Sequence, residues 1–292
     1  MKVQIVSDLH LEFQKTLPII ENAGADVLVI GGDTCLAQDL YRNPIDIRKD
    51  VIQKEDRIRF AMRYREFFDY VSSNWKHIIY IMGNHEHYNG NWTRTEDVMR
   101  NEFARYPNIH LLEQNKLVID DVVFLGATLW ADMNKGDPIT MMSIRDMLND
   151  YKAIANYSEG KEWSRLFPQV TLEKHYETVA WLRFMLSEDK RKTFVATHHA
   201  ATRQSIRDSF RGQWIINGAF ANDLDEFIID HPHIAVWSSG HVHHAHRYYI
   251  NDTLVVCNPH GYPKEITGFD STRVIDLNNL PDPSTITNNQ IW

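Results

Sequence analysis

The most informative part of the sequence reads His-Ile-Ile-Tyr-Ile-Met over residues 77–82, with Gly83-Asn84-His85-Glu86 directly after it. The first part is short, apolar and rich in β-branched residues, which is typical of a buried strand. The second part begins with a glycine, which lets the chain turn sharply, and continues with amide, imidazole and carboxylate side chains. Since ligand sites in α/β sheets form beyond the carboxyl ends of strands, this stretch predicts a strand that ends at a binding site.

Four other apolar runs end in the same way, each with aspartate or histidine close behind a stretch of strand length. These runs and their continuations are residues 2–6 with Ser7-Asp8-Leu9-His10, 26–30 with Gly31-Gly32-Asp33, 193–197 with His198-His199, and 234–238 with Ser239-Gly240-His241-Val242-His243. The carboxyl ends of neighbouring parallel strands meet at one edge of a sheet. Segments far apart in the sequence are therefore expected to converge on one site.

The remaining segments complete an α/β pattern. Residues 122–127, 254–257 and 273–277 have the length and composition of strands. Helical spacing of apolar residues occurs in 55–73 and 171–189, and 221–230 predicts a shorter helix. The faces expected to be buried are Ile58, Met62, Phe67, Phe68 and Val71 in the first helix, and Leu172, Tyr176, Val179, Leu182 and Leu186 in the second. Strands mixed with helices predict an α/β protein with a largely buried sheet.

The length of 292 residues is near the upper limit for one domain, and no repeat or low-complexity linker divides the chain. We therefore expect a single domain over residues 1–277, followed by a polar tail over 278–292. Residues 132–168 are less regular and rich in Met, Asn, Asp and Lys. This segment fits either a lid over a site or a plain surface excursion.

Composition limits the partners. The formal net charge of −8 argues against a broad surface for nucleic acid or anionic membranes, because both need a positive field. A small anionic substrate is compatible with this negative net charge, because bound cations can dominate the local potential at a site. Cys35 and Cys257 are too few for a disulfide framework and are expected to be buried and reduced. Without a secretory signal or an apolar run of about 20 residues, we expect a cytoplasmic protein with no membrane partner, and the oligomeric state stays open.

The spacing of the polar residues favours a metal site. Side chains two residues apart in an extended chain point the same way, so Asp8 and His10 can reach one ion together, and His241 and His243 can do likewise. Carboxylate, imidazole and amide donors without a thiolate suit Mn, Fe, Zn, Co or Ni better than Ca²⁺. Each motif alone also fits a turn or a structural histidine. Five such motifs, each after a strand, favour the metal site.

Together the five blocks resemble the calcineurin-like metallophosphoesterase superfamily, whose pattern is Asp-x-His, Gly-Asp, Gly-Asn-His-Asp/Glu, a later His and Gly-His-x-His. The resemblance extends over roughly residues 1 to 260. It implies a four-layer α/β/β/α sandwich of two mixed sheets flanked by helices. It also implies two divalent metal ions, of which Mn is the first expectation. The implied ligands are Asp8, His10, Asp33 and His243 for one ion, and Asp33 as a bridge with Asn84, His198 and His241 for the other.

The resemblance also implies a reaction, in which a hydroxide that bridges the two ions attacks phosphorus in line. His85 is the expected donor of the proton to the leaving oxygen, with a purely structural histidine as the alternative. An acidic partner is expected to keep His85 protonated, and the sequence does not identify it. His199 is expected beside the ligands, and His260 either contacts substrate or belongs to a turn at a strand end.

The absence of certain arginines limits the class of phosphate ester that the site is expected to accept. Protein phosphatases of this superfamily carry an arginine shortly after Gly-Asp and another before Gly-Asn-His-Glu, and neither stands here. Those arginines clamp a dianionic phosphate, so their absence favours a small phosphodiester over a phosphomonoester, and a nucleotide diester is one candidate. A nuclease of the same superfamily is the other enzymatic alternative, and an interaction scaffold of the same fold is the non-enzymatic one. The basic residues Arg57, Arg59, Arg63 and Arg65 are interpreted as a solvated helix face.

Overall fold

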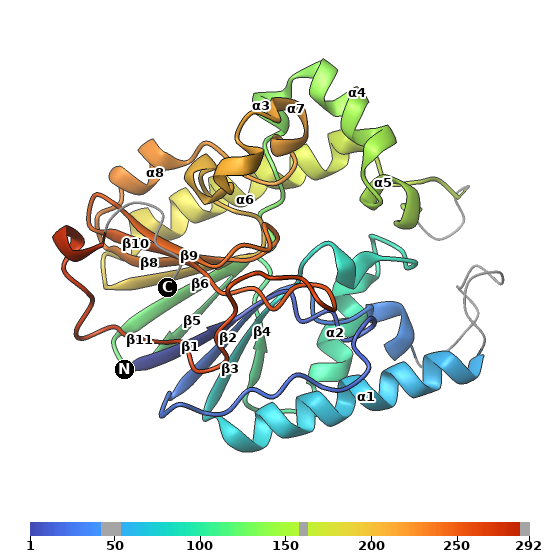
Figure 1. Ribbon diagram of the computed structural model, residues 1–292, viewed down its shortest axis with the longest axis horizontal. Coiled ribbons are helices and arrows are strands. Elements are labelled where there is room, and N and C mark those ends of the chain that lie inside the picture. Colours follow the sequence, from blue (N-terminus) through green and yellow to red (C-terminus); the bar gives the residue numbers. More distant parts are fainter. Residues whose placement is uncertain (42–53, 158–162, 287–292) are drawn as a thin grey trace.

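Two mixed sheets packed face to face form the centre of the molecule (Figure 1). The computed structural model describes residues 1–41, 54–157 and 163–286. The first sheet has the order β11-β1-β2-β3-β4, with bounds Val274–Asp276, Lys2–Val6, Val27–Gly31, His77–Ile81 and Ile109–Leu111. The second has the order β5-β6-β7-β8-β10-β9, with bounds Asn115–Ile119, Val122–Ala127, Thr193–Thr197, Ile234–Ser239, Thr253–Cys257 and His246–Ile250.

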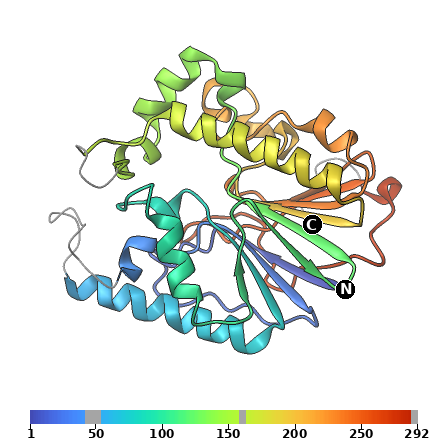
Figure 2. The ribbon, with the colours of Figure 1, turned by 180° about the vertical axis from the view of Figure 1, so that it is seen from behind.

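Helices cover the outer face of each sheet, which completes four layers (Figures 1 and 2). Helices α1 (Lys54–Asn74) and α2 (Thr95–Phe103) pack on the first sheet, and α6 (Pro168–Glu188) and α8 (Asp225–Ile229) pack on the second. Four short helices gather beyond one end of the second sheet, namely α3 (Met133–Gly136), α4 (Pro138–Met147), α5 (Asp150–Ala153) and α7 (Trp214–Asn217). The expected α/β/β/α architecture is confirmed.

Alternation along the strands explains why both faces of each sheet are buried. In β2, Val27 and Val29 point into the core between the sheets, whereas Leu28 and Ile30 point toward α1 and α2. Side chains of successive residues alternate across a strand, so an unbroken apolar run supplies two cores at once. The strands β1, β2, β3 and β4 run parallel to one another, and so do β6, β7, β8 and β10, whereas the remaining strands β11, β5 and β9 pair antiparallel at the edges of the sheets. Their carboxyl ends therefore lie at matching edges.

The predicted helix faces needed correction. Ile58 and Met62 were expected to be buried in the first helix, but both are exposed, and Tyr176 is exposed in the second. In α1 the buried stripe runs at spacings of three and four through Ala61, Tyr64, Phe68 and Val71, and in α6 it includes His175 and Thr178. Among the other predicted positions, Phe67, Phe68, Val71, Leu182 and Leu186 are buried as expected. Apolar residues are common on protein surfaces, so apolar spacing alone identified only part of each stripe. The shorter helix begins at Asp225, four residues later than predicted.

Three strands had no counterpart in the sequence analysis. β4 and β9 contain histidine, arginine or tyrosine at partly exposed positions, and β5 is largely exposed. Strands of this kind lack the continuous apolar run that identifies a buried strand.

The arginines of α1 do not all lie on one solvated face. Arg57 is buried, donates to the carbonyl oxygen of Gln38 and lies beside Asp39, and Arg63 donates to the carbonyl oxygens of Leu11 and Gln14. Their guanidinium groups satisfy backbone carbonyl groups of the loops after β1 and β2. The prediction was wrong for Arg57 and Arg63, because long arginine side chains can reach across a helix edge to backbone acceptors. The side chain of Arg59 is 66% exposed and pairs with Asp56, as expected for a solvated face.

The segment 132–168 forms a small core of its own with neighbouring residues. Ile144, Tyr151, Ile154 and Leu166 are buried together against Trp130. Residues 158–162 of this segment lie outside the described residues, and so do residues 287–292 of the tail. The described part of the tail ends at Ile286, which packs against the core between the sheets. None of the helices that the structure describes is both long and apolar enough to cross a membrane.

Gly126 lies in β6 where this strand packs closely against residues of the first sheet and the loop that follows it. A Cβ atom at this position would lie 2.5 Å from Cβ of Leu112 and 2.6 Å from Cδ1 of Ile81. We expect Gly126→Ala to lower the free energy of unfolding by about 1–3 kcal/mol, because an extra methyl group overpacks the core. Urea denaturation followed by circular dichroism measures the change. Gly212→Ala is the matched control, since no heavy atom lies within 4 Å of its added Cβ atom, and an equal loss in both variants would contradict the packing argument.

Candidate metal centre

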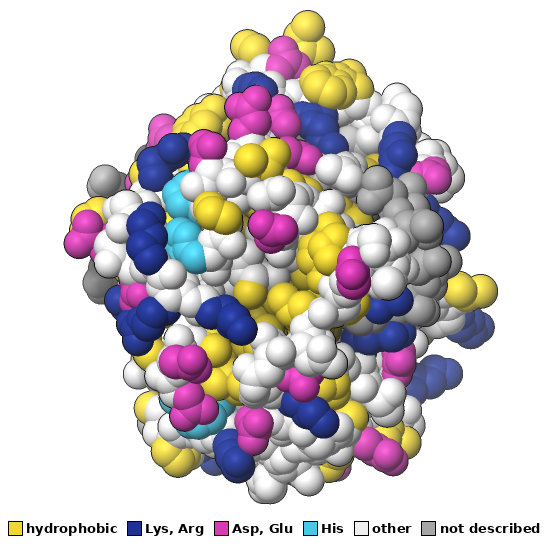
Figure 3. Space-filling model, turned by 90° about the vertical axis from the view of Figure 1, so that its left-hand side faces the viewer, with side chains coloured by type: hydrophobic (Ala, Val, Ile, Leu, Met, Phe, Trp, Pro, Cys, Tyr) yellow, Lys and Arg dark blue, Asp and Glu magenta, His cyan; other side chains and the backbone are white. Residues whose placement is uncertain are grey.

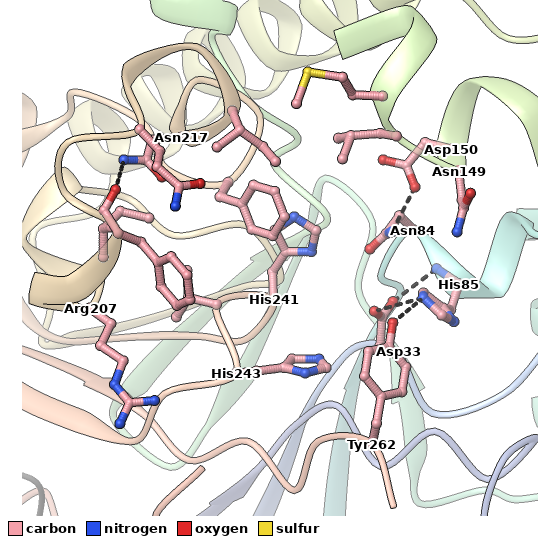
Figure 4. A pocket seen from close by; sticks show the side chains of 18 of the residues that line it. Asp33, Asn84, His85, Asn149, Asp150, Arg207, Asn217, His241, His243 and Tyr262 are labelled. Atoms are coloured by element: carbon pink, nitrogen blue, oxygen red, sulfur yellow. Dashed lines mark hydrogen bonds and ion pairs between the residues drawn. The ribbon is translucent and has the colours of Figure 1, made fainter. Parts of the chain in front are cut away.

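Five loops meet at the edge where the carboxyl ends of both sheets come together. They follow β1, β2 and β3 of the first sheet and β7 and β8 of the second. Their side chains face one another across a small volume, as Figure 4 shows for Asp33, Asn84, His241 and His243. The structure thus brings together all seven residues that the sequence analysis proposed as ligands, namely Asp8, His10, Asp33, Asn84, His198, His241 and His243.

One group of donors lies around His10. Its Nε2 atom is 3.1 Å from Nε2 of His243 and 3.9 Å from Oδ2 of Asp33. Nε2 of His243 in turn lies 3.5 Å from Oδ1 of Asp8. Two imidazole nitrogens and two carboxylate oxygens thus face the same point.

A second group lies on the other side of Asp33. Oδ1 of Asp33 is 3.3 Å from Nε2 of His198, which is 3.0 Å from Oδ1 of Asn84. A ring nitrogen of His241 completes this group. The two carboxylate oxygens of Asp33 therefore point to different groups, which is the geometry of a residue that can bridge two cations.

Five of these seven residues have backbones in the left-handed region. The φ angles are 54° at Asp8, 45° at His10, 52° at Asp33, 66° at His241 and 45° at His243. Non-glycine residues rarely adopt this region, and such conformations concentrate at functional sites where surrounding contacts hold them in place. Here hydrogen bonds hold them: the amide of Asp8 donates to the carbonyl oxygen of Gly32, and the amide of His241 donates to Oδ1 of Asp8.

Two glycines allow the loops to approach the centre. A Cβ atom at Gly83 would lie 2.1 Å from Oδ1 of Asp33, and one at Gly32 would lie 2.4 Å from Nδ1 of His198. No side chain fits at either position without displacing a donor. The glycines in the Gly-Asp and Gly-Asn-His-Glu blocks are thus required for close approach, as well as for the turn at Gly32.

Three of the imidazoles are oriented by acceptors on their outer nitrogen. Nδ1 of His10 lies 3.2 Å from Oε1 of Glu12, Nδ1 of His198 lies 2.8 Å from the carbonyl oxygen of Gly31, and Nδ1 of His243 lies 2.7 Å from Oε2 of Glu265. A proton held at Nδ1 leaves the lone pair of Nε2 directed at the centre. This arrangement is typical of histidines that bind metals.

The donors fit divalent cations. Nε2 of His241 is buried and has no hydrogen-bond partner among the described residues, although unpaired buried polar atoms are rare. Burial by itself raises the pKa of Asp33, but the neighbouring imidazoles of His198 and His85 outweigh it and hold this pKa well below its usual range. An ionised carboxylate and inward-facing imidazole lone pairs form a set that a pair of cations would satisfy.

Glu12 is the acidic partner of His85. Nδ1 of His85 lies 2.8 Å from Oε1 of Glu12, whose side chain is 4% exposed, and Nε2 of His85 lies 3.9 Å from Oδ2 of Asp33. Burial lowers the pKa of His85, but the charges of Asp33 and Glu12 raise it to about 9. The same oxygen of Glu12 also lies against His10, so one carboxylate orients both rings. The sequence analysis missed Glu12, for which the only signal was its position two residues after His10.

Glu86 joins the loops after β2 and β3. Its buried carboxylate accepts hydrogen bonds from the backbone amides of Asp33 (3.1 Å), Thr34 (2.8 Å) and Gly83 (2.6 Å) and from the hydroxyl group of Tyr80 (2.7 Å). The last residue of the Gly-Asn-His-Glu block thus holds the backbone that carries Asp33.

The structure places the two remaining candidates differently. His199 is buried, its ring centroid lies 4.2 Å from that of His241, and its Nδ1 lies 3.3 Å from the carbonyl oxygen of Thr128. Burial and the neighbouring His198 lower the pKa of His199 to about 3. His260 is half-buried and packs against Phe269 instead of lining the cavity that opens over the centre.

A cavity of about 410 Å³ opens directly over the centre. Met147, Leu148, Asn149 and Asp150 form one wall, and another is formed by Ile206, Arg207, Phe210, Gln213, Ile216, Asn217, Phe220 and Val242. Figure 4 shows Asn149 and Asp150 across the cavity from Arg207 and Asn217. The first wall belongs to the segment 132–168. The second comes mostly from residues 206–220. No sequence motif identified these residues, because loops that form such walls have variable composition.

Comparisons with known proteins agree with this fold. The family described as "Calcineurin-like phosphoesterase" matches residues 1–245. An uncharacterized protein of Acanthamoeba polyphaga mimivirus is 26% identical over 294 residues, which cover 95% of this chain and 97% of that protein. The crystal structure of phosphopantetheinyl hydrolase from Mycobacterium tuberculosis has a similar fold, with a TM-score of 0.60 and 15% identity over 90% of each chain.

Loss of Glu86 should loosen the two loops at the centre. We expect Glu86→Ala to lower the free energy of unfolding by about 3 kcal/mol or more, because several buried amides lose their acceptor. Tyr80→Phe removes only one donor to the same carboxylate and should cost about 1 kcal/mol. Chemical denaturation measures the free energy of unfolding of both variants. A smaller loss of stability in Glu86→Ala than in Tyr80→Phe would contradict this prediction.

Proposed function

We propose that this chain, which belongs to the calcineurin-like phosphoesterase family, is a phosphodiesterase that hydrolyses a small phosphodiester. The membership makes it a metal-dependent hydrolase of phosphate esters. The observation that supports the proposed site most strongly is the position of Asp33, whose two carboxylate oxygens lie in two different groups of donors.

The proposed ligands follow from these groups. One ion would be held by Asp8, His10, Asp33 and His243, and the other by Asp33, Asn84, His198 and His241. The oxygen and imidazole donors suit a borderline divalent metal, and Mn²⁺ is the ion we expect first. Bound there, two such ions would polarise phosphoryl oxygens and lower the pKa of water enough to supply a nucleophile near neutral pH.

His85 is the proposed general acid. It lines the cavity, and its outer nitrogen is held by Glu12, so Nε2 is available to give its proton to the leaving oxygen of the ester. The hydroxyl group of Tyr262 lies 3.3 Å from Nε2 of His85, and the ring of Tyr88 stacks on the imidazole at 4.2 Å. These contacts fix the direction in which the proton is presented.

The cavity supports a diester over a monoester. Arg207 is the one lysine or arginine among its described lining residues, so no pair of guanidinium groups is present to clamp a dianionic phosphate. A diester carries a single negative charge and a second organic group. Apolar side chains such as Ile206, Phe210 and Phe220 provide a surface for that group, and the volume suits a small ligand.

A nucleotide is one substrate that these walls could accept. The exposed ring of Phe210 offers a face for stacking, and the amides of Asn149 and Gln213 offer donors and acceptors for a base edge. The mycobacterial protein of similar fold is named for a phosphopantetheinyl group, so an ester of that group belongs in the same screen. A nuclease is less favoured, because the chain carries a net charge of −8 and the face in Figure 3 mixes charges of both signs.

Hydrolysis of bis(p-nitrophenyl) phosphate in the presence of Mn²⁺ tests the function directly. We expect diester turnover to exceed turnover of p-nitrophenyl phosphate, and Asp33→Asn to reduce it by at least about 100-fold, because both ions lose a shared charge. Circular dichroism verifies that the variant folds. Preference for the monoester would indicate a phosphatase, degradation of DNA a nuclease, and metal-free folding without turnover an interaction scaffold.

The proposed acid has its own test. We expect His85→Ala to reduce turnover of alkyl diesters by about 10²- to 10⁴-fold, and nitrophenyl diesters by much less, since nitrophenolate leaves without a proton. Glu12→Gln should show the same dependence on the leaving group with a smaller loss, because Glu12 acts through His85. Steady-state kinetics with the two ester classes measures the ratio. Equal losses on both classes would rule out the role.

A further inference from the structure

The two groups of donors differ in charge. The group around His10 contains two carboxylates, those of Asp8 and Asp33. The other contains only Asp33, which is shared, together with side chains that carry no negative charge, those of Asn84, His198 and His241. A divalent cation in the second group would therefore have less negative charge near it. We therefore expect a compensating negative charge among the residues packed around this group.

Asp150 is the carboxylate that meets this need. It is the first residue of α5, it is 4% exposed, and its Oδ1 atom accepts a hydrogen bond from Nδ2 of Asn84 at 2.8 Å. The same oxygen accepts a hydrogen bond from the hydroxyl group of Tyr88 at 2.5 Å. Figure 4 shows Asp150 directly above Asn84, on the side away from Asp33.

The chemistry of the contact fixes the amide of Asn84. Oδ1 of Asp150 accepts in this contact, and only the NH₂ group of the amide can donate, so the NH₂ group of Asn84 faces Asp150. The carbonyl oxygen is then directed inward, where it lies 3.0 Å from Nε2 of His198. In the opposite orientation the NH₂ group would face the cation, which it cannot bind.

The backbone around Asp150 is held to the loop that carries Asn84. The amide of Asn89 donates to the carbonyl oxygen of Ala153 at 2.9 Å, and the amide of Trp92 donates to that of Ala155 at 2.8 Å. The amide of Ala155 donates back to the carbonyl oxygen of Gly90 at 3.0 Å. These backbone bonds fix the distance between α5 and the loop after β3 without Asp150, so a substitution there changes the contact with Asn84 more than the position of the loop.

We propose that Asp150 is a positioning residue for the second cation: it orients the amide of Asn84 with its oxygen inward and supplies the negative charge that the second group lacks. The inference rests on the proposed dinuclear site. It gives the segment 132–168 a role in metal binding, in addition to forming a wall of the cavity.

Binding of Mn²⁺ tests the inference without relying on turnover. Isothermal titration calorimetry of the full chain, freed of metal, counts the ions and gives both affinities, and electron paramagnetic resonance distinguishes a coupled pair from a single ion. We expect two ions in the natural chain. In Asp150→Ala the first affinity should stay within about twofold, whereas the second should fall by about 10- to 100-fold. Asp150→Asn should lie between the two, since its amide oxygen can still accept from Asn84.

Asp146→Asn is the matched control, because it removes the same charge from an exposed position in the same segment, where Asp146 pairs with Arg145. It should change neither affinity. Two ions bound by Asp150→Ala with unchanged affinity would overturn the role of Asp150 and leave the proposed function intact. Fewer than two ions in the natural chain would instead contradict the proposed site itself. Equal weakening of both ions by Asp150→Ala would show a general structural effect, and equal second-ion affinities in the Ala and Asn variants would overturn the orienting role.

Discussion

The close approach of buried carboxylates and imidazoles at Asp33 is the constraint on which the rest of the structure depends. Removing a charged group from water is costly unless opposite charges or hydrogen bonds surround it. Around Asp33 these partners come from loops after strands of two different sheets. The backbone must then turn through left-handed conformations, and glycines must stand where loops touch. Much of the local backbone geometry follows from this one requirement.

A ring of carboxylates outside the donors keeps the centre in order. Glu12 and Glu265 each hold the outer nitrogen of an imidazole, Asp150 holds an amide, and Glu86 holds the loop amides. Each acts on a group that has two possible orientations, or on a backbone that would otherwise lack an acceptor. Fixing these choices in advance lowers the cost of ordering the site when a cation or substrate binds.

The walls of the cavity are built on a different principle. They come from the short helices α4, α5 and α7 and from the loop between β7 and α7, none of which belongs to a sheet. Such segments vary more freely than the strands that carry the donors, because they are not tied to the register of a sheet. A common chemistry at the strand ends can thus be combined with substrate recognition that is particular to this chain.

Local sequence determined the strands that carry the donors and the order in which the donors occur, because an apolar run followed by glycine and a polar residue is a local pattern. It also determined the close approach at Gly83, since only glycine permits it. The tertiary structure alone decided that Ile58, Met62 and Tyr176 are exposed, that Glu12 contacts His85 and that Asp150 contacts Asn84. Each of these three features depends on which distant segment of the chain packs against the residue. The spacing of residues within one segment carries no information about that distant segment.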